Sequence, residues 1–300
     1  MTLPAGPHGG DGARLAAQLG LDPADVLDLS ASLNPAAPPI DDLVIGAVDA
    51  VGRYPDPEPG TAAVAEMIGV DRDRLILTNG GAEAIALVAA AQRVGRIDEP
   101  EFSLYRRHLA DVRPDAPQWR SNPNNPTGLL ASAHATAAVW DEAFHVLATG
   151  AWTRGDADAW RVGSLTKAFS CPGLRIGYVI LPADADRERF ERSVPRWTVN
   201  GIAATVLPAL VDRAEPEHWR RRVAELRAQL VDLLASHGLA ADPSDANYMV
   251  VRNCGDLRTR LARRAVLVRD TQTFGFEGVR IAVPDDHGLE RLEVALKEST

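Results

Sequence analysis

The sequence predicts an α/β fold with a mostly parallel, doubly wound sheet and a smaller α+β domain. Between residues 41 and 199, short apolar runs alternate with helical patterns, as in strands joined by crossover helices. After residue 237 short strands follow one another more closely. The chain has 300 residues, 46% of them hydrophobic, which is sufficient for a large core. We therefore expect a large domain at 41–205 and a small domain made of 1–40 and 206–300.

The first third of the chain contains a candidate phosphate site. Its expected elements are a helix at 13–19, a strand at 26–30, helices at 41–51 and 61–68, a strand at 75–78 and a helix at 83–91. Asn34 precedes a proline, and such a residue avoids helical backbone. We therefore expect a non-helical, proline-rich connection after Asn34. Asn79-Gly80-Gly81 joins a strand to a helix, an arrangement that presents backbone N–H groups to a phosphate. The alternative is a glycine turn that only reverses the chain, because such turns have the same sequence pattern.

The remaining elements place a carboxylate at the end of a strand. The predicted strands are 137–140, 175–181, 247–251, 266–268 and 279–283, and the predicted helical stretches are 201–237, 257–264 and 288–297. Pro208 and Pro216 can interrupt the longest of these. Asp141 follows the first of the strands, and in an α/β chain the carboxyl end of a strand borders the ligand crevice.

Composition excludes several classes of protein. The net charge is −9 and no basic tract occurs, which argues against a nucleic-acid partner. Cys171 and Cys254 are far apart, so neither a disulfide framework nor a metal site is expected, and a reducing cytosol is favoured. The sequence shows no secretion signal and no apolar run that could span a bilayer. We expect a cytoplasmic protein with a small-molecule substrate.

One lysine has neighbours suited to an aldehyde cofactor. Lys167 lies among small hydroxyl and apolar residues at 164–169, and Arg175 follows eight positions later. A desolvated lysine, or one beside another cation, becomes nucleophilic and forms a Schiff base with an aldehyde. Ser164 and Arg175 are residue types that hold a phosphate. Together they describe a site for pyridoxal 5'-phosphate (PLP). An ordinary surface lysine is the alternative on this stretch alone.

Five motifs in one order resemble the class I/II aminotransferase family, the PLP enzymes of fold type I. The motifs are N-G-G-A-E at 79–83, F-S-L-Y at 102–105, N-P-N-N-P-T-G at 122–128, D-E-A-F at 141–144 and S-L-T-K-A-F-S-C-P-G-L-R-I-G-Y at 164–178. The resemblance covers nearly the whole chain. It is greatest to the branch of threonine-phosphate decarboxylases and histidinol-phosphate aminotransferases. Segments 8–10, 32–35, 54–57 and 197–200 favour the decarboxylase of the cobalamin pathway.

The resemblance implies roles around the cofactor ring. Lys167 would bond to the cofactor and shuttle protons, and Asp141 would pair with the pyridine nitrogen. Asn125 would bind the 3-oxygen. Phe102 would stack on the ring, with Tyr105 as the alternative. The structural alternatives are that Asp141 only forms a turn and that Phe102 and Tyr105 only pack in the core.

The resemblance also implies a set of anion-binding residues. The cofactor phosphate would be held by Gly81, Ala82, Ser164, Thr166 and Arg175. Tyr54 would reach the cofactor phosphate of the neighbouring subunit, which requires a homodimer. Arg280 would bind the substrate carboxylate and Arg269 a substrate phosphate, with Asn34 and His8 near the same end. A surface position for Arg269 and a disordered His8 are the alternatives.

Two departures from the family pattern concern activity. Phe144 occupies a position where many members have tyrosine, although phenylalanine also occurs in the decarboxylase-like branch. Only residues 129–140 separate the N-P-N-N-P-T-G motif from Asp141, where family members usually have a full helix and a strand. Without that helix, apolar surface of the sheet can be exposed.

The resemblance therefore implies a lyase, decarboxylating a small phosphorylated amino acid or amine in cobalamin biosynthesis. A transferase of the histidinol-phosphate type is one alternative, and a non-catalytic PLP-binding paralogue is another. The joint presence of Lys167, Asp141, Asn125 and Arg175 argues against the paralogue.

Overall fold

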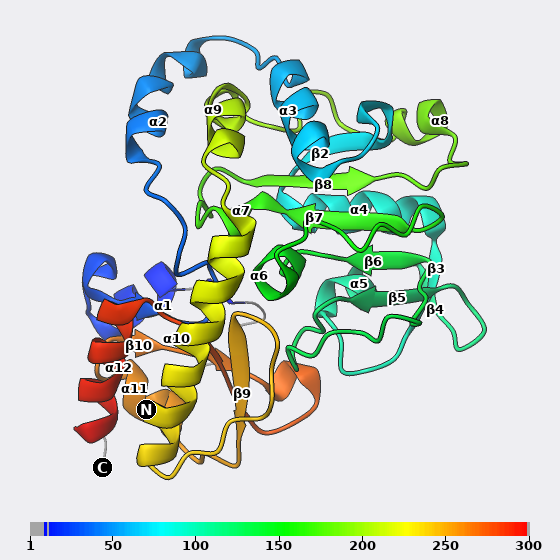
Figure 1. Ribbon diagram of the computed structural model, residues 1–300. Coiled ribbons are helices and arrows are strands. Elements are labelled where there is room, and N and C mark those ends of the chain that lie inside the picture. Colours follow the sequence, from blue (N-terminus) through cyan, green and yellow to red (C-terminus); the bar gives the residue numbers. More distant parts are fainter. Residues whose placement is uncertain (1–8, 11, 299–300) are drawn as a thin grey trace.

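A seven-stranded sheet forms the centre of the computed structural model, which describes residues 9, 10 and 12–298 (Figure 1). Its order is β2-β8-β7-β6-β5-β3-β4. The strands are β2 (Leu75–Asn79), β3 (Val94–Ile97), β4 (Asp111–Val112), β5 (Gln118–Ser121), β6 (Val139–Asp141), β7 (Trp160–Ser164) and β8 (Ile176–Ile180). β8 is antiparallel to both neighbours and the other pairs are parallel, so the predicted α/β class is confirmed.

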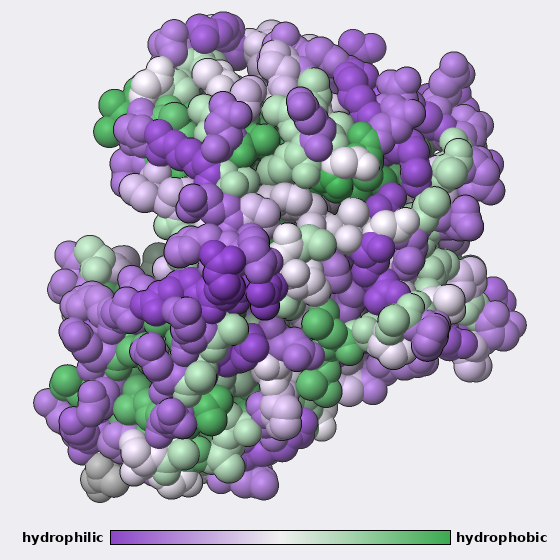
Figure 2. Space-filling view, in the orientation of Figure 1, coloured by the Kyte–Doolittle hydropathy of each residue, from purple (hydrophilic) through white to green (hydrophobic). Residues whose placement is uncertain are grey.

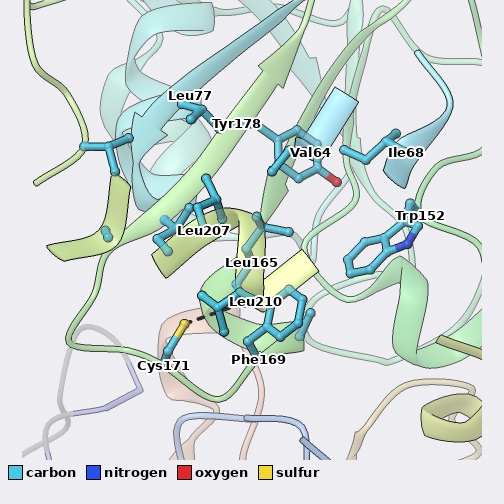
Figure 3. Close-up of a cluster of buried hydrophobic side chains, with 14 of the residues drawn as sticks. Val64, Ile68, Leu77, Trp152, Leu165, Phe169, Cys171, Tyr178, Leu207 and Leu210 are labelled. Atoms are coloured by element: carbon cyan, nitrogen blue, oxygen red, sulfur yellow. Dashed lines mark hydrogen bonds between the residues drawn. The ribbon is translucent and has the colours of Figure 1, made fainter. Parts of the chain in front are cut away.

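Helices cover both faces of this sheet, because its strands bury side chains on both sides. In β2, Leu75 and Leu77 point into one core and Ile76 into the other. The first core is closed by α3 (Glu58–Ile68), α6 (His145–Thr149), α7 (Leu165–Ala168) and α9 (Gly201–Asp212). Figure 3 shows Val64 beside Tyr178, with Leu207 and Leu210 farther along the same core near Leu165. The second core is closed by α4 (Gly80–Gln92), α5 (Ser103–His108) and α8 (Arg187–Glu191).

The C-terminal third forms a separate core together with the first residues described. Strands β11 (Arg269–Asp270), β12 (Gly278–Ala282) and β9 (Tyr248–Arg252) make an antiparallel sheet, and β1 (Leu27–Asp28) pairs in parallel with β10 (Val266–Leu267). The helices here are α1 (Gly12–Leu19), α10 (Pro216–Ser236), α11 (Leu257–Ala262) and α12 (Asp286–Lys297). Leu29 packs with Leu226 and Leu292, so segments from both ends of the chain share this core. None of the helices in the described ranges is long and apolar enough to cross a membrane.

Several elements differ from the expected ones. The helix expected at 41–51 is divided into α2 (Asp41–Gly46) and a 3-10 helix (Val48–Gly52), and α4 begins at Gly80 rather than 83. β3, β5 and β7 were not anticipated, because each carries an arginine in a run of only four or five residues. Pro208 does not interrupt α9, whereas Pro216 begins α10 at the position where its missing N–H costs nothing.

The packing of α9 bears on the domain boundary. Its buried residues Ala203, Leu207 and Leu210 all belong to the first core, which also contains the α3 and β2 side chains. Trp219 of α10 joins that core too, while Leu226 and Leu234 of the same helix join the core of the C-terminal third. We therefore propose that the boundary lies within α10 rather than at 205–206.

The connection between β5 and β6 has no helix. The two strands are parallel neighbours, but residues 122–138 contain only turns and irregular backbone. The outer face is covered instead by Arg154, whose guanidinium lies 4.4 Å from the ring centroid of Trp140 and donates to the Ala135 carbonyl at 3.1 Å. Trp140 is fully buried, although Leu129 at the start of the connection is partly exposed. Arg154 thus joins Trp140 to the helix-free connection.

Replacing that arginine should destabilise the fold. We expect Arg154→Ala to lower the free energy of unfolding by about 2–3 kcal/mol, because a desolvated cation–π contact and hydrogen bonds to the connection are lost together. Arg113→Ala is the matched control, since Arg113 forms an exposed ion pair with Asp111 and should change stability by less than about 0.5 kcal/mol. Urea denaturation of both variants measures the difference, and equal losses would show that Arg154 does not cover Trp140.

Candidate functional site

The strand register brings polar side chains to one edge of the large sheet. Ser121 pairs with Asp141, Asp141 with Val162, and Ser164 with Gly177. β5, β6 and β7 therefore end side by side, as parallel strands do at a ligand crevice. β8 runs the other way, so its first residues lie at the same edge.

A cavity of about 370 Å³ opens at this edge. It is lined by most of the residues predicted from the sequence, namely Gly81, Ala82, Phe102, Asn125, Asp141, Ser164, Thr166, Lys167, Arg175, Arg269 and Arg280. Both the large sheet and the C-terminal third contribute to the wall. Gly9, Gly10, Ser30 and Ala31 line it as well, although the sequence analysis gave none of these four a role in the site.

Among the described residues, two of the predicted ones are not in the cavity wall. Tyr54 is 77% exposed and its ring stacks on Trp197 at 4.4 Å. Asn34 is buried beside the cavity, but its Nδ2 donates to the Ala168 carbonyl at 2.8 Å and its Oδ1 accepts from the Ala36 N–H at 2.9 Å. Its side chain therefore braces the backbone, and substrate binding by Asn34 stays a prediction. His8 lies outside the described residues.

Lys167 is half-buried in the short helix α7, three residues after β7 ends at Ser164. Its Nζ donates to the Ala31 carbonyl at 2.6 Å. Burial, followed by the positive charges of Arg280 and Arg175, lowers the pKa of Lys167 to about 8. The amine is therefore far more available as a nucleophile at neutral pH than an exposed lysine.

Asp141 is the buried acid at the end of β6. The Tyr105 hydroxyl donates to its Oδ2 at 2.8 Å and the Ala143 N–H to its Oδ1 at 3.0 Å. Burial raises the pKa of Asp141, while the Ala143 N–H, Tyr105 and Lys167 oppose that rise. Phe102 faces the cavity and Tyr105 lies behind it, edge to face at 5.9 Å. Tyr105 is thus placed as a partner of Asp141, a position that the sequence motif did not reveal.

Glycines create the space beside Arg175. Gly80 has a φ of +75°, and a Cβ there would lie 2.2 Å from Arg175 Nη2. A Cβ on Gly177 would lie 2.4 Å from the backbone carbon of Gly80. Arg175 itself has a φ of +56°. The close approach of these backbones forms a pocket in which N–H groups at the start of α4 lie near the Ser164 hydroxyl and the Arg175 guanidinium.

Two buried arginines lie opposite each other on β11 and β12. Arg269 and Arg280 are register partners, and both line the cavity. Arg280 donates from Nη1 to Asn125 Oδ1 at 2.5 Å and from Nη2 to the Ser30 carbonyl at 3.2 Å, while its buried Nε meets no acceptor among the described residues. Arg269 donates to Thr273 Oγ1 at 3.0 Å. Two buried cations in one wall suit a ligand with two anionic groups.

Comparisons with known proteins agree with this geometry. The family model described as aminotransferase class I and II matches residues 119–297. The threonine-phosphate decarboxylase of Salmonella typhimurium is 29% identical, over 99% of this chain and 97% of that protein. Histidinol-phosphate aminotransferase 2 of Ralstonia nicotianae is 28% identical over 96% of this chain and 93% of that protein. The histidinol-phosphate aminotransferase of Sinorhizobium meliloti, solved with pyridoxal 5'-phosphate, superposes with a TM-score of 0.79 at 19% identity, covering 99% of this chain and 95% of that one.

The space beside Arg175 can be tested by adding one methyl group. Gly69 matches Gly80 in having a φ of +75°, but a Cβ at Gly69 would meet nothing within 4 Å. We expect Gly69→Ala to lower the free energy of unfolding by about 1–2 kcal/mol, through backbone strain alone. Gly80→Ala should cost about 1–3 kcal/mol more, because the guanidinium must also move. Equal losses in urea denaturation would contradict the close contact.

Proposed function

The chain belongs to the aminotransferase class I and II family, and from that premise we propose that it decarboxylates a small phosphorylated amino acid, as a threonine-phosphate decarboxylase-like enzyme of cobalamin biosynthesis. It is a PLP-dependent enzyme of that family, and its fold is that of the PLP aminotransferases. The finer assignment is supported by the similarity to the Salmonella decarboxylase over nearly the full length of both proteins.

The residues of the cavity fit PLP. Gly81 and Ala82 at the start of α4 line the cavity together with Ser164 and Arg175, and this set of backbone N–H groups, hydroxyl and guanidinium suits a phosphate. The buried carboxylate of Asp141 suits a protonated ring nitrogen. When bound, PLP supplies an electron sink for the bond that breaks at the substrate Cα.

The protein's own groups would then position the reactants and move a proton. Lys167, with its lowered pKa, would hold the cofactor aldehyde through Nζ and afterwards carry a proton to or from the substrate. Asp141 would keep its negative charge against the ring nitrogen, and Phe102 would cover one face of the ring. Phe144 lies 5.8 Å from Lys167 Nζ by its ring centroid and offers no hydroxyl there.

The observation that carries the substrate assignment is the buried pair of Arg269 and Arg280. Arg280 has an Nε that no acceptor reaches within the described part of the chain, so a substrate carboxylate would satisfy it. Arg269 on the neighbouring strand would then take a second anionic group, such as a phosphate. An amino acid with a phosphate on its side chain has both groups.

A transferase of the histidinol-phosphate type remains the second candidate function. It is supported by the similarity to the Ralstonia enzyme. Histidinol phosphate carries a phosphate but no carboxylate, so it would leave the Nε of Arg280 without an anion. Its amino acceptor, 2-oxoglutarate, would satisfy that group instead. The two functions differ in which Cα bond is held perpendicular to the cofactor ring.

We further propose a cytoplasmic homodimer. Apolar side chains reach the surface on and after α2, where Figure 2 shows apolar atoms, and the exposed residues include Ile45, Val48, Val51, Tyr54 and Trp197. Burying such a surface against a second copy would remove it from water, and two-fold dimers are the commonest oligomers. Tyr54 would then extend into the neighbour's site. The two cysteines are free and buried, which supports a reducing compartment.

A substrate assay tests the proposed reaction. We expect PLP-loaded protein to release CO2 from O-phosphothreonine, and Lys167→Ala protein to lose turnover while still binding PLP through its phosphate contacts. Transfer of the amino group from histidinol phosphate to 2-oxoglutarate would instead establish the second candidate. If wild-type protein binds PLP but shows neither activity, both candidate functions are refuted. Turnover by Lys167→Ala at the wild-type rate would show that the lysine is misassigned.

The shared site can be tested by mixing subunits. Tyr54→Phe should weaken PLP binding by about 1.5–3 kcal/mol, the size of one hydrogen bond to a charged group. A heterodimer of Tyr54→Phe and Lys167→Ala subunits would contain one doubly damaged site and one intact site. Activity at limiting PLP should therefore rise above that of either mutant homodimer after subunit exchange. No gain despite proven exchange, or an active species that sediments as a monomer, would exclude this role for Tyr54.

A further inference from the structure

A buried tyrosine lies behind Arg280 and has no role in the reaction described above. Tyr248 begins β9, is fully buried, and is not among the described residues that line the cavity. The next residues of the strand alternate, and Met249 and Val251 pack in the core of the C-terminal third. Tyr248 points from the opposite face of the sheet, and its ring packs against Phe144 of the large domain.

The register of β9 and β12 places Tyr248 and Arg280 on one face of their sheet. Tyr248 pairs with Ala282, and Arg280 pairs with Val250. Residues two positions apart on a strand share a face, and diagonal neighbours on paired strands are within reach of long side chains. The Arg280 Cζ accordingly lies 4.6 Å from the centroid of the Tyr248 ring. The ring therefore forms one wall of the space that the guanidinium occupies.

The contacts of this guanidinium within the described part of the chain are with uncharged groups. Arg280 Nη1 donates to Asn125 Oδ1 at 2.5 Å, Nη2 donates to the Ser30 carbonyl at 3.2 Å, and the third contact is the aromatic ring. A buried cation is normally paired with an anion, because removing its charge from water is costly. The charge of Arg280 is therefore left for an anionic ligand to neutralise.

An aromatic ring holds a guanidinium without using its N–H groups. A guanidinium has five N–H donors, and a cation–π contact is made with the face of the ring and needs none of them. A carboxylate in the place of Tyr248 would accept from those donors and neutralise the charge, so it would compete with a substrate carboxylate. The Tyr248 ring leaves the donors available, and the Arg280 Nε meets no acceptor among the residues that the structure describes.

Tyr248 is itself held by the large domain. Its hydroxyl donates to the Asn124 carbonyl at 2.9 Å, and the Phe144 ring packs against it edge to face, with the centroids 5.0 Å apart. Asn124 directly precedes Asn125, the residue that accepts from Arg280. One loop thus fixes both the tyrosine and the arginine, and the ring cannot turn away without breaking the hydrogen bond to that loop.

We propose that Tyr248 is a positioning residue for the substrate carboxylate. Its ring holds the Arg280 guanidinium in place while leaving the N–H donors to the substrate, and its hydroxyl fixes that ring against the Asn/Pro loop at 122–128. The inference rests on the proposed role of Arg280 as the residue that binds the carboxylate. It extends that role, because the place where the carboxylate is held decides which Cα bond stands perpendicular to the cofactor ring.

Two ligands without an amino group test this role by binding alone. 3-Phosphonopropionate carries a phosphonate and a carboxylate, whereas propylphosphonate carries only the phosphonate, and neither can react with the PLP aldehyde. The ratio of their dissociation constants for PLP-loaded protein, measured by calorimetry, therefore reports the carboxylate contact. We expect wild-type protein to prefer 3-phosphonopropionate and Arg280→Gln protein to lose most of that preference.

Removing the ring should weaken the carboxylate contact selectively. We expect Tyr248→Leu to reduce the preference about tenfold, because the guanidinium loses its cation–π contact and is free to move. The affinity for propylphosphonate should stay within about twofold of the wild-type value. Tyr248→Phe keeps the ring and should retain the preference to within about threefold. Tyr248→Met is a second variant without a ring, for use if the leucine protein fails to fold.

Phe276→Leu is the matched control. It removes a ring that lies 4.1 Å from the Arg252 Cζ and is not among the described residues that line the cavity, so the preference should not change. An equal loss in this control would show that the effect is not specific to the ring beside Arg280.

The outcomes separate this inference from the proposed function. A wild-type preference in folded Tyr248→Leu or Tyr248→Met protein, or a tenfold loss in Tyr248→Phe, would overturn the inference alone, provided that Arg280→Gln has lost the preference. No preference in wild-type protein would instead overturn the proposed role of Arg280.

Discussion

The register of five neighbouring strands is the constraint on which the site depends. Ser121, Asp141 and Ser164 end three adjacent strands, in which Ser121 pairs with Asp141 and Asp141 with Val162, while Gly177 near the start of β8 lies opposite both Ser164 and Thr78 of β2. A slip of one residue in any of these pairs would turn its side chains to the other face. The apolar alternation of β2 and β8 into two separate cores excludes such a slip. Packing thus fixes the chemistry at the sheet edge.

Positive charge is concentrated where that register leaves space. Lys167, Arg175, Arg269 and Arg280 all face one cavity, and Asp141 is the acid among its lining residues. The excess of cations lowers the pKa of Lys167 beyond the effect of burial alone, and it makes the cavity receptive to anions before any substrate enters. The same excess of positive charge thus lowers the pKa of the Lys167 amine and favours anionic ligands.

The sequence predicted the residues whose chemistry is local and missed those that act through a neighbour. Lys167 and Arg175 share a short motif with recognisable phosphate partners, and Asp141 follows an apolar strand. Tyr105 looked like an alternative stacking ring because nothing in the sequence shows that its hydroxyl meets Asp141. Asn34 donates to the Ala168 carbonyl, more than a hundred residues away, and nothing in the sequence shows that contact. The contact of Arg154 with Trp140 is equally unpredictable from the sequence.

The stacked pair of Tyr54 and Trp197 has an optical consequence. The chain has six tryptophans, and Trp197 is the one whose side chain is largely open to solvent, while Trp119, Trp140 and Trp219 are almost completely enclosed. An indole in water emits at longer wavelength and is reached by dissolved quenchers that enclosed indoles escape. If two copies meet over this surface, the emission of Trp197 would shift toward shorter wavelength and become protected. The protein therefore carries its own fluorescent reporter of association, at the residue that supports Tyr54.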